Sequence, residues 1–311
     1  MKKIFKFVKQ NIIGFIIGGI VFGSLGVYAA GVITSQEVTY EDNTSIGATN
    51  VQDAIDKLNT KATTKIAEAK KECPDGYICT KPSFKDDSWS TIATNVKAGK
   101  ASAYQVGDTK TIDMGDLWTH TVRVANTSAC TNGETSQTAC GFVVEFADII
   151  TKQAMNSDMT NVGGWPASAM RTYVNGTIYN ALPSDLQGII ADTTVVSGHG
   201  STSGEENFTS TDKLYLLSTK EVWGKDGTSN EITNDTAEAE TRQLDYYKNL
   251  GVTTSNYSGA IKQYNGSNSY WWLRSAKSSK TRSFFMVSSD GGWFISFATG
   301  ADSVSPAFRI A

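Results

Sequence analysis

Short runs rich in β-branched and aromatic residues alternate with clusters of Gly, Asn, Asp and Ser along the chain from Cys73 onward. Such runs, bounded by turn-forming residues, are typical of β-strands. The strand candidates are WTHTVRVAN, FVVEFADII, KLYLLS, YWWLRS, FFMVSS and WFISFA. We therefore expect residues 73–311 to form one globular domain that contains many short strands.

One interval of this domain has helical rather than strand periodicity. In PASAMRTYVNGTIYNAL, an apolar residue recurs every fourth position and predicts one buried face, made of Met170, Val174, Ile178 and Leu182. Directly after it, Ser184-Asp185-Leu186-Gln187 has the form of a capping box that opens a second short helix. Two helices beside a mixed or antiparallel sheet give an α+β fold class.

The first 33 residues have the pattern of a membrane-directed segment. Four lysines, Lys2, Lys3, Lys6 and Lys9, precede an uncharged apolar run that ends at Ile33. A run of this length can span a bilayer as a helix, whereas Val27-Tyr28-Ala29 and Ala30 form a small-residue cleavage site. Residues 1–33 are therefore either a cleaved signal peptide or a membrane anchor.

The positive-inside rule orients this segment. The next basic residue after it is Lys57, so the charge bias places everything beyond residue 33 outside the cytoplasm. We expect the protein at the extracellular face of the cell membrane, or secreted if the segment is cleaved.

Residues 34–72 change from a polar, β-like composition to a helical pattern that starts at about Asn50. A narrow apolar stripe recurs at helical spacing and consists of Val51, Ile55, Leu58, Ala62 and Ile66. The stretch TNVQDAID resembles a spacer found in phage fibres and exported proteins of gut Firmicutes. That resemblance implies a self-associating stalk and a homo-oligomer, while packing of the helix on its own globular domain is the alternative.

Composition and charge argue against some classes of function. Hydrophobic residues make up 40% of the chain and charged residues 19%, and the net charge is -3. Without a basic face, nucleic-acid binding is not expected. The four cysteines form two local pairs, Cys73 with Cys79 and Cys130 with Cys140, neither with CxxC spacing. We interpret them as disulfides of an oxidising compartment, although all three pairings remain open.

Several stretches resemble successive landmarks of a gut-bacterial domain of unknown function. They are GGWPASAMRTYVNGTIYNALPSDLQGII, DKLYLLSTKEVWG, QLDYYKN, YWWLRSA and VSPAFRI. The WWLRS and PAF ending is similar to that of C-type-lectin-like and formylglycine-generating-enzyme-type folds. It also resembles the variable proteins of diversity-generating retroelements, whose last strands carry randomised residues. The resemblance covers roughly residues 100–311 and implies a C-type-lectin-like, ligand-binding domain. One position departs, because Ser305 stands where the family usually has Arg before Pro-Ala-Phe.

The two aromatic segments of the C-terminal part have different expected roles. The continuous apolar run Trp271-Trp272-Leu273 favours the core, with Arg274 hydrogen-bonded internally. By contrast, Ser288-Ser289-Asp290-Gly291-Gly292 predicts a tight hairpin turn.

Large apolar residues flank this turn on both sides, and strand geometry sends neighbours to opposite faces. About half of them should therefore face solvent, unless inserted loops bury both faces. Exposed aromatics beside hydroxyl groups are typical of adaptable binding surfaces. The predicted contact set is Phe285, Trp293, Phe294, Ser296, Phe297, Thr299 and Asp302.

Catalytic and metal-binding patterns are weak. The two histidines, His120 and His199, lie in no metal-ligand spacing, and no cysteine follows Cys140. One polar stretch holds the carboxylates Glu221, Glu231, Asp235, Glu238 and Glu240, which we interpret as a solvated face. We expect no enzyme activity and no cofactor. A structural Ca2+ is conceivable because Asp and Asn are frequent, but no EF-hand spacing occurs.

These patterns favour a surface-displayed, adhesin-like or receptor-like protein that binds a protein or cell-surface ligand through a contact surface open to diversification. A fibre or pilus-associated assembly subunit is the main alternative. An exported hydrolase ranks behind both.

Overall fold

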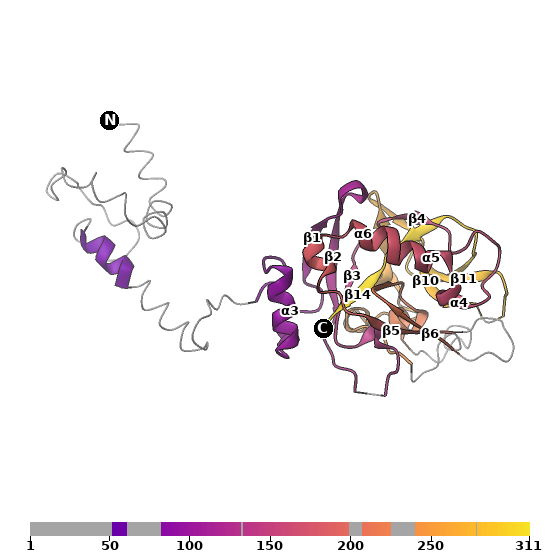
Figure 1. Cartoon of the computed structure of the whole chain (residues 1–311), viewed down its shortest axis with the longest axis horizontal. Coiled ribbons are helices and arrows are strands. Elements are labelled where there is room, and N and C mark those ends of the chain that lie inside the picture. The colour runs from indigo at the N-terminus through magenta and orange to yellow at the C-terminus, as the bar shows by residue number, and fades with distance from the viewer. Residues whose placement is uncertain (1–51, 61–81, 132, 199–206, 225–239, 278) are drawn as a thin grey trace. The chain divides into compact units, whose positions relative to one another are not determined.

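A computed structural model describes residues 52–60, 82–131, 133–198, 207–224, 240–277 and 279–311 (Figure 1). The chain divides into two units, Met1–Lys81 and Pro82–Ala311. In the first unit the described residues 52–60 form a helix, which agrees with the helical pattern predicted there. Ile55 of the predicted stripe is exposed in this helix.

Several predictions fall on residues that the structure leaves undescribed. They are the membrane-directed segment 1–33, the stripe positions Val51, Ala62 and Ile66, and the pair Cys73 and Cys79. Among the described helices, none is both long and apolar enough to cross a bilayer.

The second unit contains two five-stranded sheets. The first sheet has the strand order β1 (Thr109–Asp113), β2 (Thr119–Asn126), β3 (Phe142–Phe146), β14 (Ala307–Ile310) and β7 (Leu214–Tyr215). Every neighbouring pair in it is antiparallel. The last strand of the chain therefore lies inside the sheet, between β3 and β7.

The second sheet carries most of the C-terminal strands. Its order is β12 (Trp293–Phe297), β11 (Ser283–Val287), β10 (Trp271–Ala276), β13 (Asp302–Val304) and β4 (Thr151–Gln153). β10 and β13 are parallel, and the other pairs are antiparallel. The α+β class with a mixed and largely antiparallel sheet is confirmed.

Two further hairpins complete the strands. β5 (Thr193–Ser197) pairs with β6 (Phe208–Asp212), and β8 (Lys262–Tyr264) pairs with β9 (Ser267–Ser269).

The helices are short and more numerous than the two predicted. They are α3 (Trp89–Lys97), α4 (Gly164–Ala167), α5 (Ala169–Tyr173), α6 (Tyr179–Ala181), α7 (Ser184–Gln187), α8 (Thr219–Trp223) and α10 (Asp245–Asn249). The predicted helix around Met170 is real and buries the expected face, but a π-turn over Val174–Ile178 interrupts it. Within that turn, Asn175 hydrogen-bonds both backbone groups of Leu214 and so positions β7.

The capping box predicted at Ser184 is wrong. Helix α7 begins at Ser184 itself, after Pro183, and has no side-chain cap. The described capping box lies instead at Ser218 and Glu221, at the start of α8. The sequence pattern occurs in both places, but at α7 the Gln187 side chain donates to the carbonyl of Leu182, whereas at α8 the Glu221 side chain accepts from the Ser218 amide.

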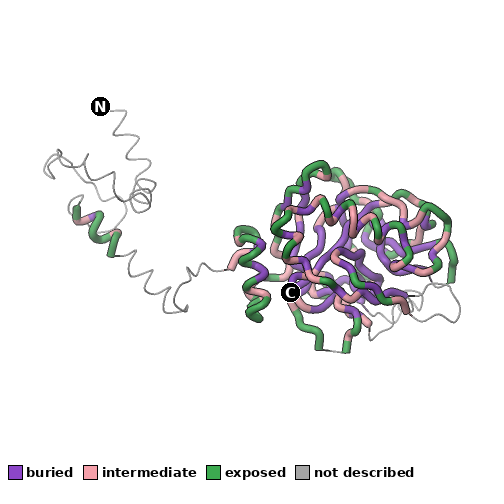
Figure 2. Tube along the Cα trace, viewed as in Figure 1, coloured by how far each residue is buried: buried purple, intermediate pink, exposed green. Residues whose placement is uncertain are grey.

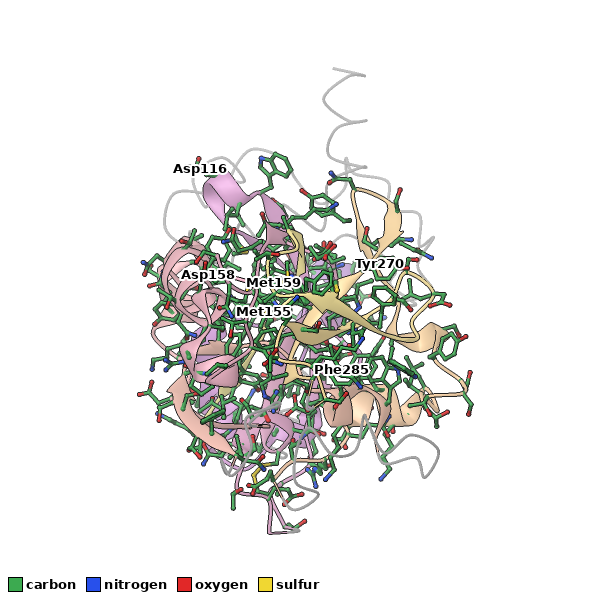
Figure 3. The ribbon with its side chains drawn as sticks, turned by 90° about the vertical axis from the view of Figure 1, so that its right-hand side faces the viewer. Asp116, Met155, Asp158, Met159, Tyr270 and Phe285 are labelled. Atoms are coloured by element: carbon green, nitrogen blue, oxygen red, sulfur yellow. A yellow bond between two sulfur atoms is a disulfide. The ribbon has the colours of Figure 1, made fainter. Side chains whose placement is uncertain are left out.

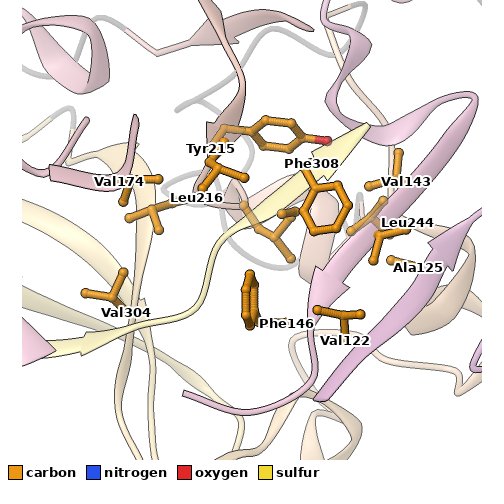
Figure 4. Packing of buried hydrophobic residues seen from close by; sticks show 14 of the residues in the cluster. Val122, Ala125, Val143, Phe146, Val174, Tyr215, Leu216, Leu244, Val304 and Phe308 are labelled. Carbon is orange, nitrogen blue, oxygen red and sulfur yellow. The ribbon is translucent and has the colours of Figure 1, made fainter. Parts of the chain in front are cut away.

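The core follows the two sheets, and the buried strands run through the interior while exposed positions gather on the connecting segments (Figure 2). Figure 4 shows Phe308 of β14 among residues from several elements, including Phe146, Tyr215 and Val122. Trp271, Trp272 and Leu273 are fully buried, as the continuous apolar run predicted. Full burial of one such side chain contributes about 1.5–3 kcal/mol.

Candidate functional site

The predicted contact set centres on β12, the edge strand of the second sheet. Its inner neighbour β11 is buried at every position, whereas every position of β12 is at least partly exposed. Trp293, Phe294 and Phe297 keep 40, 46 and 54% of their surface exposed. A short strand thus holds three large aromatic side chains at the surface, next to two strands, β11 and β10, that are buried along their whole length.

The hairpin predicted before β12 is confirmed. The amide of Ser288 donates to the carbonyl of Gly292 over 2.7 Å, and the amide of Gly291 donates back to Ser288. Gly291 has a φ of +93°, and a Cβ there would lie 2.1 Å from the carbonyl oxygen of Tyr257. Only glycine fits this position, so the turn fixes where β12 starts.

The two faces of β12 present different aromatic contacts. Trp293 lies on the same face as its cross-strand neighbour Val287 and forms an edge-to-face contact with Phe285, at 6.4 Å between ring centroids. Phe294 lies on the opposite face and packs edge-to-face against Tyr270, at 5.2 Å. Both pairs orient the exposed rings.

The prediction that Phe285 contacts a ligand is wrong. It belongs to β11 and is fully buried, beneath Trp293 and beside the Lys277 ammonium group. It therefore supports the surface from below and is not exposed to a ligand. The sequence could not separate it from its neighbours because both hairpin strands carry aromatics in succession.

The polar members of the set lie where β12 ends. Ser296 hydrogen-bonds Asp302, and a Cβ built on Gly300 would lie within 3.2 Å of both side chains. Burial raises the pKa of Asp302, although Lys152 and the Ser296 hydrogen bond oppose this shift. Thr299 is exposed in the connecting segment. The structure therefore brings Ser296 and Asp302 together, with Thr299 beside them in the chain.

Tyr270 is a surface residue that the sequence analysis missed. It directly precedes the buried run Trp271-Trp272, yet it keeps 38% of its surface exposed. Figure 3 labels it together with Phe285 on the C-terminal strands, and with Met159 from the segment before α4. That segment is tied to the end of β12, because the amide of Asn156 donates to the carbonyl of Ala298. We call Tyr270, Trp293, Phe294 and Phe297 the β12 surface.

A buried ion pair anchors the strands behind this surface. Arg274 of β10 donates from both terminal nitrogens to the two oxygens of Glu221, each over 2.6 Å, and both residues are fully buried. The internal hydrogen bonding predicted for Arg274 is confirmed. Glu221, however, was expected on a solvated face, and this expectation is wrong.

The environment of Glu221 keeps it ionised. Burial alone would raise its pKa, but the Arg274 guanidinium and hydrogen bonds from Thr138 and the Ser218 amide outweigh burial, and the pKa lies below its usual value. Of the other carboxylates in that predicted stretch, Glu231, Asp235 and Glu238 fall outside the described residues.

A second buried network surrounds Ser305. Lys262 donates to Glu145, to the carbonyl of Phe146 and to the Ser305 hydroxyl over 2.7 to 2.9 Å. The Ser305 hydroxyl lies within hydrogen-bond distance of two carbonyls, those of Phe146 at the end of β3 and of Asp148 just after it. Lys262 thus places a buried cation beside Ser305, between β13 and β14.

The charges of this network compensate one another. Burial lowers the pKa of Lys262 to about 8, although Glu145 acts in the opposite direction. Burial would raise the pKa of Glu145, but Arg123 and Lys262 outweigh it and the pKa is lowered. Both networks lie inside the fold, without an exposed reactive group, so we interpret them as structural.

No group of metal-ligating side chains gathers within the described part of the chain. His120 is buried and hydrogen-bonds the carbonyl of Leu117 over 2.7 Å and the Asp148 carboxylate. His199 lies outside the described residues. The predicted pairing of Cys130 with Cys140 is present, with the two Cα atoms 4.9 Å apart.

No curated protein and no solved structure matches the chain. A family model described as a domain of unknown function, DUF6273, matches residues 143–311. The match starts within β3 and includes the β11–β12 hairpin and the Arg274–Glu221 pair. Because it spans more than half of the sequence, the chain belongs to the DUF6273 family.

Proposed function

We propose that this protein recognises a protein or cell-surface ligand outside the cell and that the β12 surface makes the contact. The observation that carries the proposal is the exposure of Trp293, Phe294 and Phe297 on one edge strand. Aromatic rings are enriched where proteins bind one another, because each supplies a large contact area at little cost in side-chain entropy. Ser296 and Thr299 add hydroxyl groups beside them.

The support beneath these rings favours tight recognition. β11 is buried along its whole length, and Phe285 and Tyr270 contact two of the exposed rings from the side. Side chains that are already oriented lose less entropy on binding. The role that we propose for this surface is recognition, not catalysis.

The finer fold that we propose is C-type-lectin-like. Two features support this fold. The last strand, β14, lies between β3 and β7, and most strands of the second sheet directly precede β14 in the chain. We also propose that the exposed positions of the segment 282–303 are diversified among sibling proteins, since exposed positions tolerate substitution at little cost in stability. Aligned siblings that differ mainly in that segment would support this, and a uniformly constant segment would contradict it.

The display that we propose uses the segment 1–33 as an anchor or export signal. Its lysines remain on the cytoplasmic side, and the Cys130–Cys140 disulfide suits an oxidising compartment.

A binding selection tests the recognition proposal. The full chain is immobilised and used to select peptides from a phage-displayed random library. Selected clones should bind the Trp293→Ala, Phe297→Ala double variant at least about 100-fold more weakly, because two central rings are lost. Trp118→Ala, which removes an exposed ring from the β1–β2 connection, is the matched control and should bind like the wild type. Equal binding to the double variant contradicts the proposal.

A second candidate is an assembly subunit of a fibre or pilus. Ile55, exposed on the helix 52–60, favours it, because an apolar side chain on a polar helix is a site for self-association. In sedimentation, a chain lacking residues 1–33 should then form oligomers that Ile55→Glu dissociates. Purely monomeric particles would rule this candidate out.

A further inference from the structure

The four edges of the two five-stranded sheets differ in how they are protected. β1 carries Lys110 and Asp113, β4 carries Lys152, and β7 is a buried strand of two residues. Charged side chains and very short strands are the usual means by which edges avoid pairing with other chains. β12, with the sequence WFISF, has five residues and neither a charge nor a proline. Of these described edges it alone is open to pairing.

The backbone groups that β12 turns outward follow from its register. Bonds from Ser288 to Gly292 and from Ala298 to Arg282 mark hydrogen-bonded pairs at both ends of the β11–β12 ladder. Because bonded and non-bonded pairs alternate in an antiparallel ladder, the even-numbered residues of β12 bond to β11. The amides and carbonyls of Trp293 and Ile295, and the amide of Phe297, therefore point away from the sheet. The carbonyl of Phe297 already accepts from Gly300.

We propose that β12 accepts an extended peptide segment of a partner protein as an added antiparallel strand of the second sheet. This inference rests on the proposed function and names the form that the ligand takes. Main-chain hydrogen bonds to the open edge supply affinity, as in other complexes formed by strand addition. Antiparallel pairing is the arrangement of the β11–β12 ladder that the peptide would extend.

The exposed rings select the side chains of the peptide. On one face of the sheet, Trp293 and Phe297 flank the position beside Ile295, and on the other face Phe294 packs against Tyr270. An added strand places its own side chains alternately on these two faces. β-branched or aromatic residues on both faces fit, because such cross-strand pairs are favourable.

Charges at the two ends of β12 set the direction of the peptide. Asp290 lies in the turn before Trp293, where hydrogen bonds from Ser288 and the Gly292 amide lower its pKa and keep it ionised. At the other end, Arg282 is exposed and its carbonyl accepts from Ala298, next to Phe297, while the half-buried Asp302 carboxylate there is hydrogen-bonded to Ser296 and offset by the Lys152 ammonium group. An antiparallel peptide starts at the Phe297 end. A peptide that complements these charges carries an acidic residue near its N-terminus, close to Arg282, and a basic residue near its C-terminus, close to Asp290.

The direct test uses a defined probe on the full chain. The probe is a fluorescent, end-capped peptide of alternating Val and Thr with Asp at the N-terminal end and Lys at the C-terminal end. Fluorescence anisotropy should show saturable binding, at least about tenfold weaker when Asp and Lys are exchanged. Stronger binding of the exchanged peptide overturns the antiparallel orientation, and no binding of either peptide overturns strand addition.

Backbone pairing is separated from side-chain contact by N-methylation of the probe. Two peptides carry N-methyl groups on all odd or all even residues, which blocks the amides on one edge of the strand at a time. Strand addition predicts that one of the two binds at least about tenfold more weakly than the other, because only one edge faces β12. Equal binding of both overturns it.

Two protein variants distinguish this inference from the recognition proposal. Ile295→Pro removes one outward amide and should abolish peptide binding, since proline is tolerated on an edge strand where its nitrogen faces solvent. Its thermal unfolding is compared with Ile295→Ala, which keeps the amide and should retain binding. If phage-selected clones lose binding to the Trp293→Ala, Phe297→Ala variant but not to Ile295→Pro, recognition stands and strand addition fails. If neither variant loses binding, both proposals fail.

Discussion

Glu221 and Arg274 show how single residues organise the interior of this protein. Each is fully buried, and each would be costly alone, because a charge without a partner is poorly tolerated in a protein interior. Together with Thr138 and Thr241 they join the segment before β3, α8 and β10. The pair therefore fixes elements that lie far apart in the sequence.

Glu221→Gln should destabilise the domain by about 3–5 kcal/mol, because it leaves the Arg274 charge buried without a counter-ion. Urea unfolding followed by tryptophan fluorescence measures this change. The paired replacement Glu221→Leu with Arg274→Met should cost less than the single variant, since no charge remains buried. Asp116→Asn, at an exposed position, serves as control and should stay within about 0.5 kcal/mol of the wild type.

The same variant should change the acid response. The pKa values of Glu221 and Glu145 are lower in the folded protein than the ordinary value of 4.5. The unfolded state binds more protons between the folded and unfolded pKa values, so their stabilisation is present above roughly pH 4.5 and is lost as the pH falls further. Glu221→Gln should therefore flatten the loss of stability on acidification. An unchanged acid dependence would contradict this role for Glu221.

Trp118 is a strained residue at the surface. Its φ of +66° and ψ of -168° lie in a region that essentially only glycine adopts, and 68% of the side chain is exposed. Trp118→Gly should therefore stabilise the domain, by about 1 kcal/mol or less, while Trp118→Ala keeps the Cβ and should not. Thermal unfolding of the two variants gives the comparison, and equal behaviour would show that the backbone strain is negligible.

At the scale of elements, the β11–β12 hairpin decides where the exposed rings lie. β11 is enclosed in the core, and the turn at Gly291 lies against the Tyr257 backbone, with the Trp223 indole donating to the Gly291 carbonyl. The position of β12 therefore depends on packing at the turn as well as on pairing with β11.

Gly291→Ala should destabilise the hairpin by more than about 2 kcal/mol, since the new methyl group overlaps the Tyr257 carbonyl and the positive φ is retained. Gly266→Ala is the matched control, because Gly266 also has a positive φ in a hairpin turn but has open space around it. The control should cost only about 1 kcal/mol. Equal unfolding midpoints for the two variants would contradict the steric argument.

For the whole molecule, the Cys130–Cys140 disulfide provides a test of the proposal that residues 1–33 export the chain. Cys130 and Cys140 close a loop between β2 and β3, and Arg242 binds the same loop through the carbonyls of Ser128, Ala129 and Ala139. A bond of this kind persists where the compartment is oxidising.

In bacterial cells, the disulfide should form in the full chain and remain reduced in a chain that lacks residues 1–33. Alkylation of free thiols followed by mass spectrometry of the Cys130 and Cys140 peptides measures this difference. The reduced domain should be less stable by about 2–3 kcal/mol, from the loss of a short closed loop. A Cys73→Ser, Cys79→Ser background keeps the measurement specific. Oxidation independent of residues 1–33 would contradict export by that segment.

Local patterns were sufficient for several features of the fold. The WWL run predicted a buried strand, the SSDGG turn predicted the hairpin, and the fourfold spacing from Met170 predicted a buried helical face. Each depends on neighbours in sequence, through period-two or period-3.6 burial and through the backbone freedom of glycine. Period-two alternation did not predict which aromatics beside the turn are exposed, because the neighbours Trp293 and Phe294 are both exposed whereas β11 is buried on both faces.

Only the tertiary structure decided which of several similar residues in a segment are buried. Phe285 and Phe294 look alike in sequence, but β11 is an inner strand and β12 is an edge strand, and strand order is a long-range property. Likewise, the polar residues around Glu221 suggest an exposed side chain, but in the structure α8 places it against Arg274, 53 residues away. The sequence by itself determined the buried WWL strand, the hairpin turn before β12 and the buried helical face that starts at Met170. The tertiary structure decided exposure and charge pairing, because both depend on contacts between segments that are distant along the chain.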